Sequence, residues 1–171
     1  MRFVCSLVLA LWVSMAAGAS SPALRPLPGD SAAPLALKDV DGATHDLARY
    51  RGKVILVNFW ATWCEPCRQE MPSMQRLRER FAADRFAVLA VNVDEPDARV
   101  RRFITETQLT LPVLMDPGKT VTRAWGVRVL PTSFLVGPDG RARYRLVGDI
   151  DWNNETVVGT VTQLMKAHVE K

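Results

Sequence analysis

The chain has 171 residues, of which 48% are hydrophobic and 23% are charged, and its formal net charge is +4. This length suits one globular domain with a targeting segment and is short for two domains, and the composition is that of an ordinary soluble protein. The arginines are dispersed among acidic residues, without the basic and aromatic alternation that follows a nucleic-acid backbone, so nucleic acid is not an expected partner.

The N-terminal segment, residues 1–19, has the pattern of a secretory signal. Arg2 is its only charged side chain, residues 3–17 are almost wholly apolar, and Ala17-Gly18-Ala19 fits the small-x-small pattern of a cleavage site. The apolar run is shorter than the roughly 20 residues that a membrane span needs. We therefore predict a signal peptide over residues 1–19, with an uncleaved membrane anchor as the alternative.

Residues 20–34 hold four prolines and a glycine, and this composition indicates a linker or extended lead-in without a packed element. The folded domain is then expected over residues 35–171. At its start, residues 35–38 and 44–47 flank Asp41-Gly42, which is a turn signal. This arrangement predicts a short β-hairpin.

A continuous apolar and β-branched run follows at residues 54–60, typical of a strand that is covered on both faces. Directly behind it comes Cys64-Glu65-Pro66-Cys67, and then apolar residues recur at helical spacing up to Phe81. Pro66 suits the first turn of a helix, where its missing N–H removes no hydrogen bond. The two cysteines are therefore expected at the start of a helix that follows a buried strand.

The rest of the chain alternates between strands and helices. A second buried strand is expected over residues 87–93 and an amphipathic helix over 98–107, which argues for parallel strands joined by a crossover. A short helix over 119–125, a hairpin of strands 132–136 and 142–147, and a final helix from an Asn153 or Asn154 cap to about residue 170 complete the pattern. The fold class is α/β, with one domain and a mixed sheet.

The two cysteines have a chemical use rather than a structural one. Cleavage after residue 19 leaves only Cys64 and Cys67, and a disulfide across so small a loop restricts the unfolded chain very little. The N–H groups and positive dipole end of a helix favour a thiolate, which is the species that attacks disulfides. Cys64 is expected to attack, and Cys67, one turn further in, to resolve the mixed disulfide.

Three alternatives use the same cysteines. Half of a zinc site has this spacing, but no third mature cysteine exists, and His45 and His168 lie far apart in sequence. A Cu(I) or zinc carrier would add Met71 or Met74 to the two sulfurs, although helical spacing places both methionines on the apolar face. A thiol peroxidase would need proline and threonine at fixed distances before the cysteine, where this chain has valine and alanine. Disulfide exchange without a cofactor or metal is favoured.

Residues 57–72 resemble the active-site segment of the TlpA/ResA-like branch of the thioredoxin superfamily, and the likeness extends from about Leu35 to the C-terminus. It includes residues 52–53, 91–95 and 126–132. The resemblance implies a thioredoxin fold, with a mixed central sheet flanked by helices, an N-terminal hairpin and a central βα insertion. It also implies a periplasmic or membrane-tethered thiol–disulfide oxidoreductase, and several members of this branch serve cytochrome c maturation.

The resemblance also implies supporting site residues. Leu130 and Pro131 match the cis-proline loop that faces the dithiol. Glu95 matches an acidic residue near the active site, where a carboxylate can move protons for the resolving thiol; the alternative is an ordinary solvated charge. Asn58 stands where thioredoxins proper carry a buried aspartate, so that base is lost. Trp63 shields Cys64, contacts partners or simply packs.

The expected partners are proteins that carry disulfides or thiols. By resemblance we favour reduction, with apocytochrome c or another cysteine-bearing protein as the client and a membrane electron donor that restores the dithiol. Residues 1–19 are a possible membrane tether. The direction of electron flow depends on the reduction potential, to which Glu65 and Pro66 between the cysteines contribute.

Overall fold

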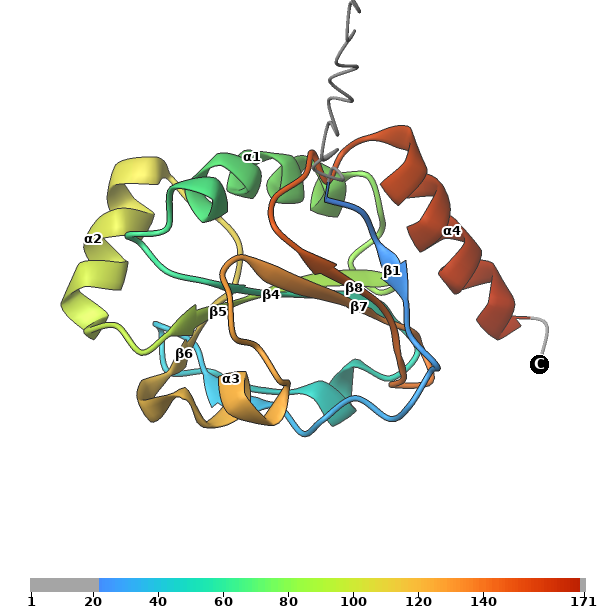
Figure 1. The fold of residues 1–171 in the computed structure, drawn as a ribbon, viewed down its shortest axis with the longest axis horizontal. Coiled ribbons are helices and arrows are strands. Elements are labelled where there is room, and N and C mark those ends of the chain that lie inside the picture. Colours follow the sequence, from blue (N-terminus) through green and yellow to red (C-terminus); the bar gives the residue numbers. More distant parts are fainter. Residues whose placement is uncertain (1–21, 170–171) are drawn as a thin grey trace, which may run out of the picture.

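Strand β4 (Val54–Trp60) runs through the middle of the sheet and is buried on both faces. The computed structural model describes residues 22–169, which form a sheet with helices on both sides (Figure 1). The predicted signal peptide or anchor over residues 1–19 lies outside the described residues. Within residues 22–169, none of the helices combines the length and the apolar character needed to cross a membrane.

The other elements follow in chain order along the described residues. The remaining strands are β1 (Arg25–Pro26), β2 (Ala36–Lys38), β3 (Thr44–Asp46), β5 (Phe86–Val93), β6 (Val113–Asp116), β7 (Thr132–Val136) and β8 (Ala142–Val147). The helices are the 3-10 turns η1 (Leu47–Tyr50) and η2 (Pro117–Lys119) and the α-helices α1 (Glu65–Glu79), α2 (Asp97–Thr107), α3 (Thr120–Ala124) and α4 (Glu155–Val169).

The main sheet of the described part has the strand order β1-β8-β7-β4-β5-β6. Strands β4, β5 and β6 are parallel, whereas β7 pairs antiparallel with both β4 and β8. The predicted mixed sheet of a thioredoxin-like fold is therefore confirmed. The predicted N-terminal hairpin is also confirmed, as β2 and β3 pair with Leu37 opposite His45.

Alternate side chains of β4 enter two different cores. Leu56 and Trp60 pack with helices α1, α2 and α4 on one face, while Val57 and Phe59 pack with the hairpin and α3 on the other. Figure 1 shows these two layers on opposite sides of the sheet. Burial on both faces explains why the strand is apolar at nearly every position.

The interpretation of residues 20–34 as a linker without a packed element is wrong for residues 22–34, the part that the structure describes. Strand β1 pairs with β8, with Arg25 opposite Arg145, and the N–H of Leu27 donates to the Arg143 carbonyl at 2.8 Å. Pro26 cannot donate to a neighbouring strand, but β1 is the outermost strand of the sheet, where proline is tolerated. The prolines therefore mark an edge strand.

The final helix begins as predicted. Asn154 precedes α4, and its Oδ1 accepts a hydrogen bond from the Val157 N–H at 3.0 Å. This contact satisfies one of the free N–H groups of the first turn. The cap fixes the start of α4 shortly after Trp152, whose side chain is fully buried.

Candidate active site

Cys64 and Cys67 form a disulfide at the start of α1, with their Cα atoms 5.3 Å apart. Cys64 is the N-cap of the helix, and its Sγ accepts a hydrogen bond from the Cys67 N–H at 3.3 Å. Cys64 is 5% exposed, whereas Cys67 is completely buried. The sulfur that solvent or a partner can reach is therefore that of Cys64.

The helix start favours a negative charge on this sulfur. The N–H groups of the first turn have no partner within the helix, and the aligned peptide dipoles leave a partial positive charge there. An N–H that already points at Sγ in the disulfide is available to a thiolate when the disulfide opens. The arrangement thus supports Cys64 as the attacking group and Cys67 as the resolving group.

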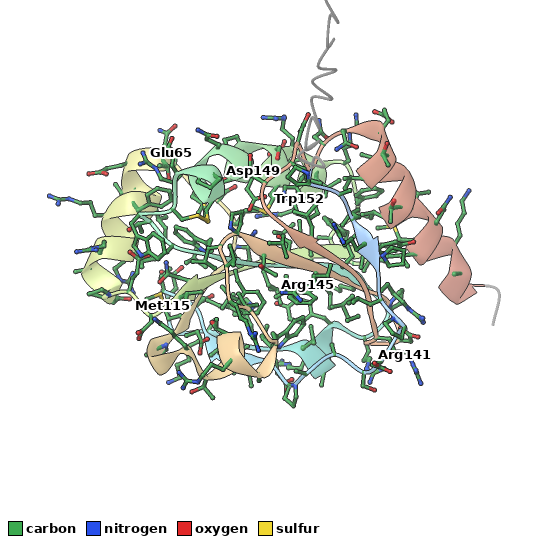
Figure 2. All side chains as sticks on the ribbon, in the orientation of Figure 1. Glu65, Met115, Arg141, Arg145, Asp149 and Trp152 are labelled. Atoms are coloured by element: carbon green, nitrogen blue, oxygen red, sulfur yellow. A yellow bond between two sulfur atoms is a disulfide. The ribbon has the colours of Figure 1, made fainter. Side chains whose placement is uncertain are left out.

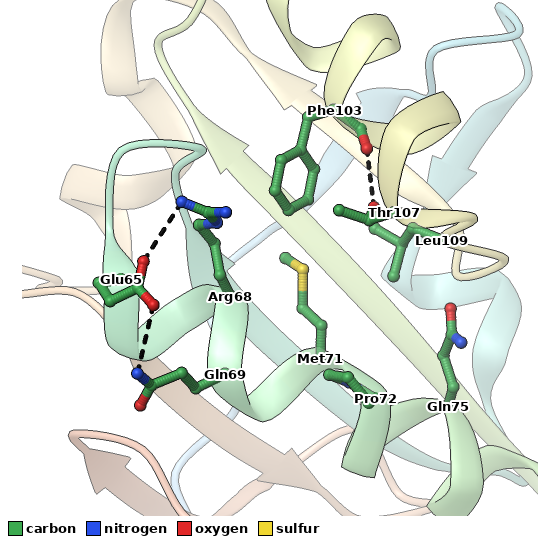
Figure 3. A pocket seen from close by; sticks show the side chains of 9 residues that line it. All are labelled: Glu65, Arg68, Gln69, Met71, Pro72, Gln75, Phe103, Thr107 and Leu109. Carbon is green, nitrogen blue, oxygen red and sulfur yellow. Dashed lines mark hydrogen bonds and ion pairs between the residues drawn. The ribbon is translucent and has the colours of Figure 1, made fainter.

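The two residues that flank Cys64, Trp63 and Glu65, are exposed. Trp63 is 67% exposed, so it offers an aromatic surface next to Cys64. Glu65 accepts hydrogen bonds from Arg68 Nη1 at 3.2 Å and Gln69 Nε2 at 3.3 Å, which hold its carboxylate at the helix surface (Figure 3). Pro66 occupies the first turn of α1, as predicted.

A groove of about 240 Å³ lies beside Glu65, between α1 and α2. Figure 3 shows Met71, Phe103 and Leu109 among the side chains that line it. Met71 is 3% exposed and belongs to the core cluster, as does the fully buried Met74. Both methionines therefore serve the packing of the helix on the sheet.

Leu130 and Pro131 are joined by a cis peptide bond, as the resemblance implies. Phe59 lies opposite Thr132 in the β4–β7 register, which places Pro131 at the carboxyl end of β4, where the chain leads to Cys64. The Thr132 hydroxyl donates to the Val129 carbonyl at 2.7 Å and holds this loop in place. The proline loop and the dithiol are thus at the same end of the sheet.

Glu95 contacts the loop that leads into Cys64. Its carboxylate accepts hydrogen bonds from the Thr62 N–H and the Thr62 hydroxyl, both at 2.6 Å, and from Asn92 Nδ2 at 2.8 Å. Its side chain is only 4% exposed, so it is not a solvated surface charge. These bonds tie the residues before Cys64 to the end of β5.

Sequence reasoning missed Glu70, a buried carboxyl group on α1. It is 2% exposed and accepts hydrogen bonds from Asn58 Nδ2 at 2.7 Å and Trp152 Nε1 at 2.8 Å. Burial is the main cause that raises the pKa of Glu70 to about 8, against opposing effects of these two hydrogen bonds. The available signal was its spacing: Glu70 follows Cys67 by three residues and precedes Met74 by four, on the apolar face of the helix.

Asn58 links Glu70 to the sheet. Its Nδ2 also donates to Ser133 Oγ at 2.8 Å, while its buried Oδ1 has no hydrogen-bond partner among the described residues. The strand position therefore lacks an acid, as expected, but helix α1 brings a carboxyl group to the same place. A buried group with a pKa near neutrality is suited to acid–base work.

Comparison with known proteins agrees with this site. Residues 28–145 match the family model described as AhpC/TSA family. The chain is 40% identical over 120 residues to the thiol-disulfide oxidoreductase ResA of Geobacillus thermodenitrificans, covering 70% of this chain and 69% of that protein. It is 35% identical over 121 residues to the protein of the same name from Bacillus thuringiensis strain Al Hakam, covering 71% and 70%.

Solved structures of thiol–disulfide exchange proteins are also similar to this chain. A putative thiol:disulfide interchange protein DsbE from Chlorobium tepidum is 31% identical with a TM-score of 0.74, covering 84% of this chain and 99% of that one. The exposed lipoprotein thioredoxin Etrx1 of Streptococcus pneumoniae is 27% identical with a TM-score of 0.66, covering 79% and 99%. The chain belongs to the AhpC/TSA family of the thioredoxin superfamily and is a thiol–disulfide oxidoreductase of the ResA-like kind.

Proposed function

We propose that this oxidoreductase exchanges disulfides with client proteins outside the cytoplasm and that it acts on them as a reductase. The observation that carries the proposal is the position of Cys64 at the start of α1, with Cys67 fully buried behind it. The exposed indole of Trp63 beside this sulfur supports a protein as the substrate, because it offers an apolar contact to a docking polypeptide.

The reaction transfers two electrons from the dithiol to the client. The Cys64 thiolate attacks one sulfur of the client disulfide, forms a mixed disulfide and releases the other client sulfur as a thiolate. The Cys67 thiol then loses its proton and attacks the Cys64 sulfur, which forms the Cys64–Cys67 disulfide and releases the second client sulfur as a thiolate. A dithiol donor, which we place in the membrane, returns two electrons to the enzyme and restores the Cys64 thiolate and the Cys67 thiol.

The proton of Cys67 needs an acceptor inside the protein, because this residue is fully buried. We propose that Glu70 accepts it, since Glu70 lies one helical turn beyond Cys67 on the same helix. Its pKa of about 8 allows Glu70 both to accept and to release a proton near neutral pH. Glu95 then has a positioning role, since its carboxylate is engaged by Thr62 and Asn92.

Replacing Glu95 tests this division of roles. Glu95→Ala removes three hydrogen bonds and should lower the free energy of unfolding by about 2–4 kcal/mol, with a slower exchange rate because the loop before Cys64 loosens. Glu95→Gln keeps an acceptor for Thr62 and should restore most of both quantities. The shape of the rate against pH should match the wild type in Glu95→Gln; a lost inflection would assign proton transfer to Glu95 instead.

We place the protein in the periplasm, free after cleavage of residues 1–19 or held by them at the inner membrane. The targeting pattern of that segment supports export. The structurally similar protein of Streptococcus pneumoniae is described as an exposed lipoprotein, which supports a location outside the cytoplasm. For the client we propose apocytochrome c or another protein whose cysteines must be kept reduced in an oxidising compartment.

Trapping clients with Cys67→Ser in the native host tests the proposed function. This variant keeps the attacking thiol but cannot resolve the mixed disulfide, so adducts with exported proteins should accumulate and should disappear on treatment with a dithiol. Mass spectrometry of the adducts identifies the clients. The double variant Cys64→Ser/Cys67→Ser is the control and should trap nothing. Adducts restricted to cytoplasmic proteins, or none at all, would contradict the proposal.

A further inference from the structure

We infer that the client-binding surface beside the dithiol is cationic as well as apolar, and that it selects polypeptide segments in which acidic residues accompany the reactive cysteine. The inference rests on the proposed function and narrows its substrate class. It begins with the three large hydrophobic side chains that are exposed among the described residues: Trp63 at 67%, Val129 at 59% and Val147 at 46%.

All three lie at the dithiol end of the sheet. Trp63 directly precedes Cys64, and Val129 comes two residues before the cis-proline. Val147 lies opposite Thr132 in the β7–β8 register, next to that proline. Exposed apolar groups that gather around a reactive sulfur indicate a surface on which a partner docks.

The apolar surface continues into a row of arginines. Side chains two residues apart on a strand share a face, so Arg145 lies on the same face of β8 as Val147. Arg25 of β1 is directly opposite Arg145. Like charges in this position repel and destabilise a pair of strands, so the stability of the sheet does not account for them.

The loop before the proline adds two more arginines. Arg145 donates to the Gly126 carbonyl at 3.4 Å, which places this loop against β8, and the exposed Arg123 and Arg128 flank Gly126 in sequence. We call these four side chains the cationic strip; its members are Arg25, Arg123, Arg128 and Arg145. Among the described residues, no carboxylate forms an ion pair with any of the four.

The contacts of Arg145 do not neutralise its positive charge. Its guanidinium lies 5.7 Å from the centre of the Phe134 ring and donates a hydrogen bond to the uncharged carbonyl of Gly126. Asp149 follows Val147 by two residues, but its negative charge lies near Glu70, on the α1 side of the sheet. Figure 2 shows Arg145 on the opposite side, towards α3.

Charge complementarity therefore points to an acidic polypeptide segment as the occupant. Its cysteine or disulfide reaches Cys64, its apolar side chains contact Trp63, Val129 and Val147, and its carboxylates lie along the cationic strip. Charges of opposite sign raise the rate of association and suppress wrong partners, and salt weakens both effects. By contrast, Arg76 of α1 and Arg101 of α2 are already paired with carboxylates.

Two peptides test the inference on the reduced protein. Each peptide contains the same intramolecular disulfide. The residues that flank it are aspartates in one peptide and lysines in the other, and the two peptides are otherwise identical. We expect the acidic peptide to be reduced on the order of ten times faster at low salt, with the ratio approaching one at high salt. Charge reversal in Arg123→Glu/Arg128→Glu should remove or invert this ratio, because both side chains are exposed.

The matched control is Arg49→Glu/Arg85→Glu. These two exposed arginines also lack an ion pair among the described residues, and they precede the amino ends of β4 and β5, away from the dithiol. The control should keep the wild-type ratio. Equal rates for the two peptides, or the same loss of preference in both variants, would overturn the inference.

A small neutral disulfide, dithiodipyridine, separates this failure from that of the proposed function. If the wild type reduces dithiodipyridine and reduces both peptides at the same rate, the proposed exchange activity is supported and the inferred preference for acidic clients is overturned. If it reduces none of them, the proposed function fails. Binding to vesicles of anionic lipid that is lost in Arg123→Glu/Arg128→Glu, without a peptide preference, would assign the strip to a membrane surface and would also overturn the inference.

Discussion

Cys64→Ser is expected to reduce the rate of disulfide exchange on the order of a thousandfold or more, to the level seen without enzyme. Serine at the helix start lacks the sulfur on which the mixed disulfide forms, and the remaining thiol of Cys67 is fully buried. The measurement is the rate of reduction of insulin or of a peptide disulfide with an excess of a dithiol donor.

The matched variant Cys67→Ser separates attack from resolution. It should still form one mixed disulfide per molecule, and a small alkylating reagent should modify its Cys64 at a lower pH than it modifies a free cysteine peptide, because the helix start favours the thiolate. Thermal unfolding of both reduced variants should match the reduced wild type. Continued turnover by a folded Cys64→Ser protein would show that Cys64 is not the attacking group.

Local patterns predict the parts of the site that depend on neighbouring residues. The buried strand β4, the cysteines at the start of α1 and the Asn154 cap all follow from the order of side chains within a few positions. The proline-rich segment is different, because a proline in an edge strand and a proline in a linker look alike until the pairing partner is known. That partner, β8, lies more than a hundred residues away.

The buried network around the dithiol could not be predicted in the same way. Glu70 receives one hydrogen bond from Trp152, 82 residues further along the chain, and Glu95 receives two from Thr62, 33 residues before it. A glutamate on the apolar face of a helix has two explanations in sequence: the buried face of the helix is assigned incorrectly, or the carboxyl group is buried and has hydrogen-bond donors around it. The hydrogen-bond donors that the fold brings to Glu70, Asn58 and Trp152, decide between these two explanations.

Glu70→Gln is expected to remove a large part of the pH dependence of stability in the oxidised protein. Burial raises the pKa of Glu70 from 4.5 to about 8, so between these values the folded state keeps a proton that the unfolded state has lost. The free energy of unfolding therefore falls as pH rises through this window, by about 3 to 4 kcal/mol between pH 5 and pH 8. Glutamine does not ionise and is not subject to this loss.

At pH 5 the variant should be within about 1.5 kcal/mol of the wild type. The amide of Asn58 can turn so that its unpartnered Oδ1 accepts a hydrogen bond from the new side chain. At pH 8 the variant should be the more stable protein. Denaturant unfolding of the oxidised form at several pH values measures this difference, and the oxidised form keeps both thiols from titrating.

The exposed Glu79 on the same helix supplies the control, because Glu79→Gln should leave the pH dependence of stability unchanged. In the reduced enzymes, the rate of disulfide exchange against pH should lose its inflection near pH 8 in Glu70→Gln and keep it in Glu79→Gln. A Glu70→Gln protein with the wild-type dependence of both stability and rate would mean that this carboxyl group is already ionised in the fold. The proton of Cys67 would then have to leave by another route.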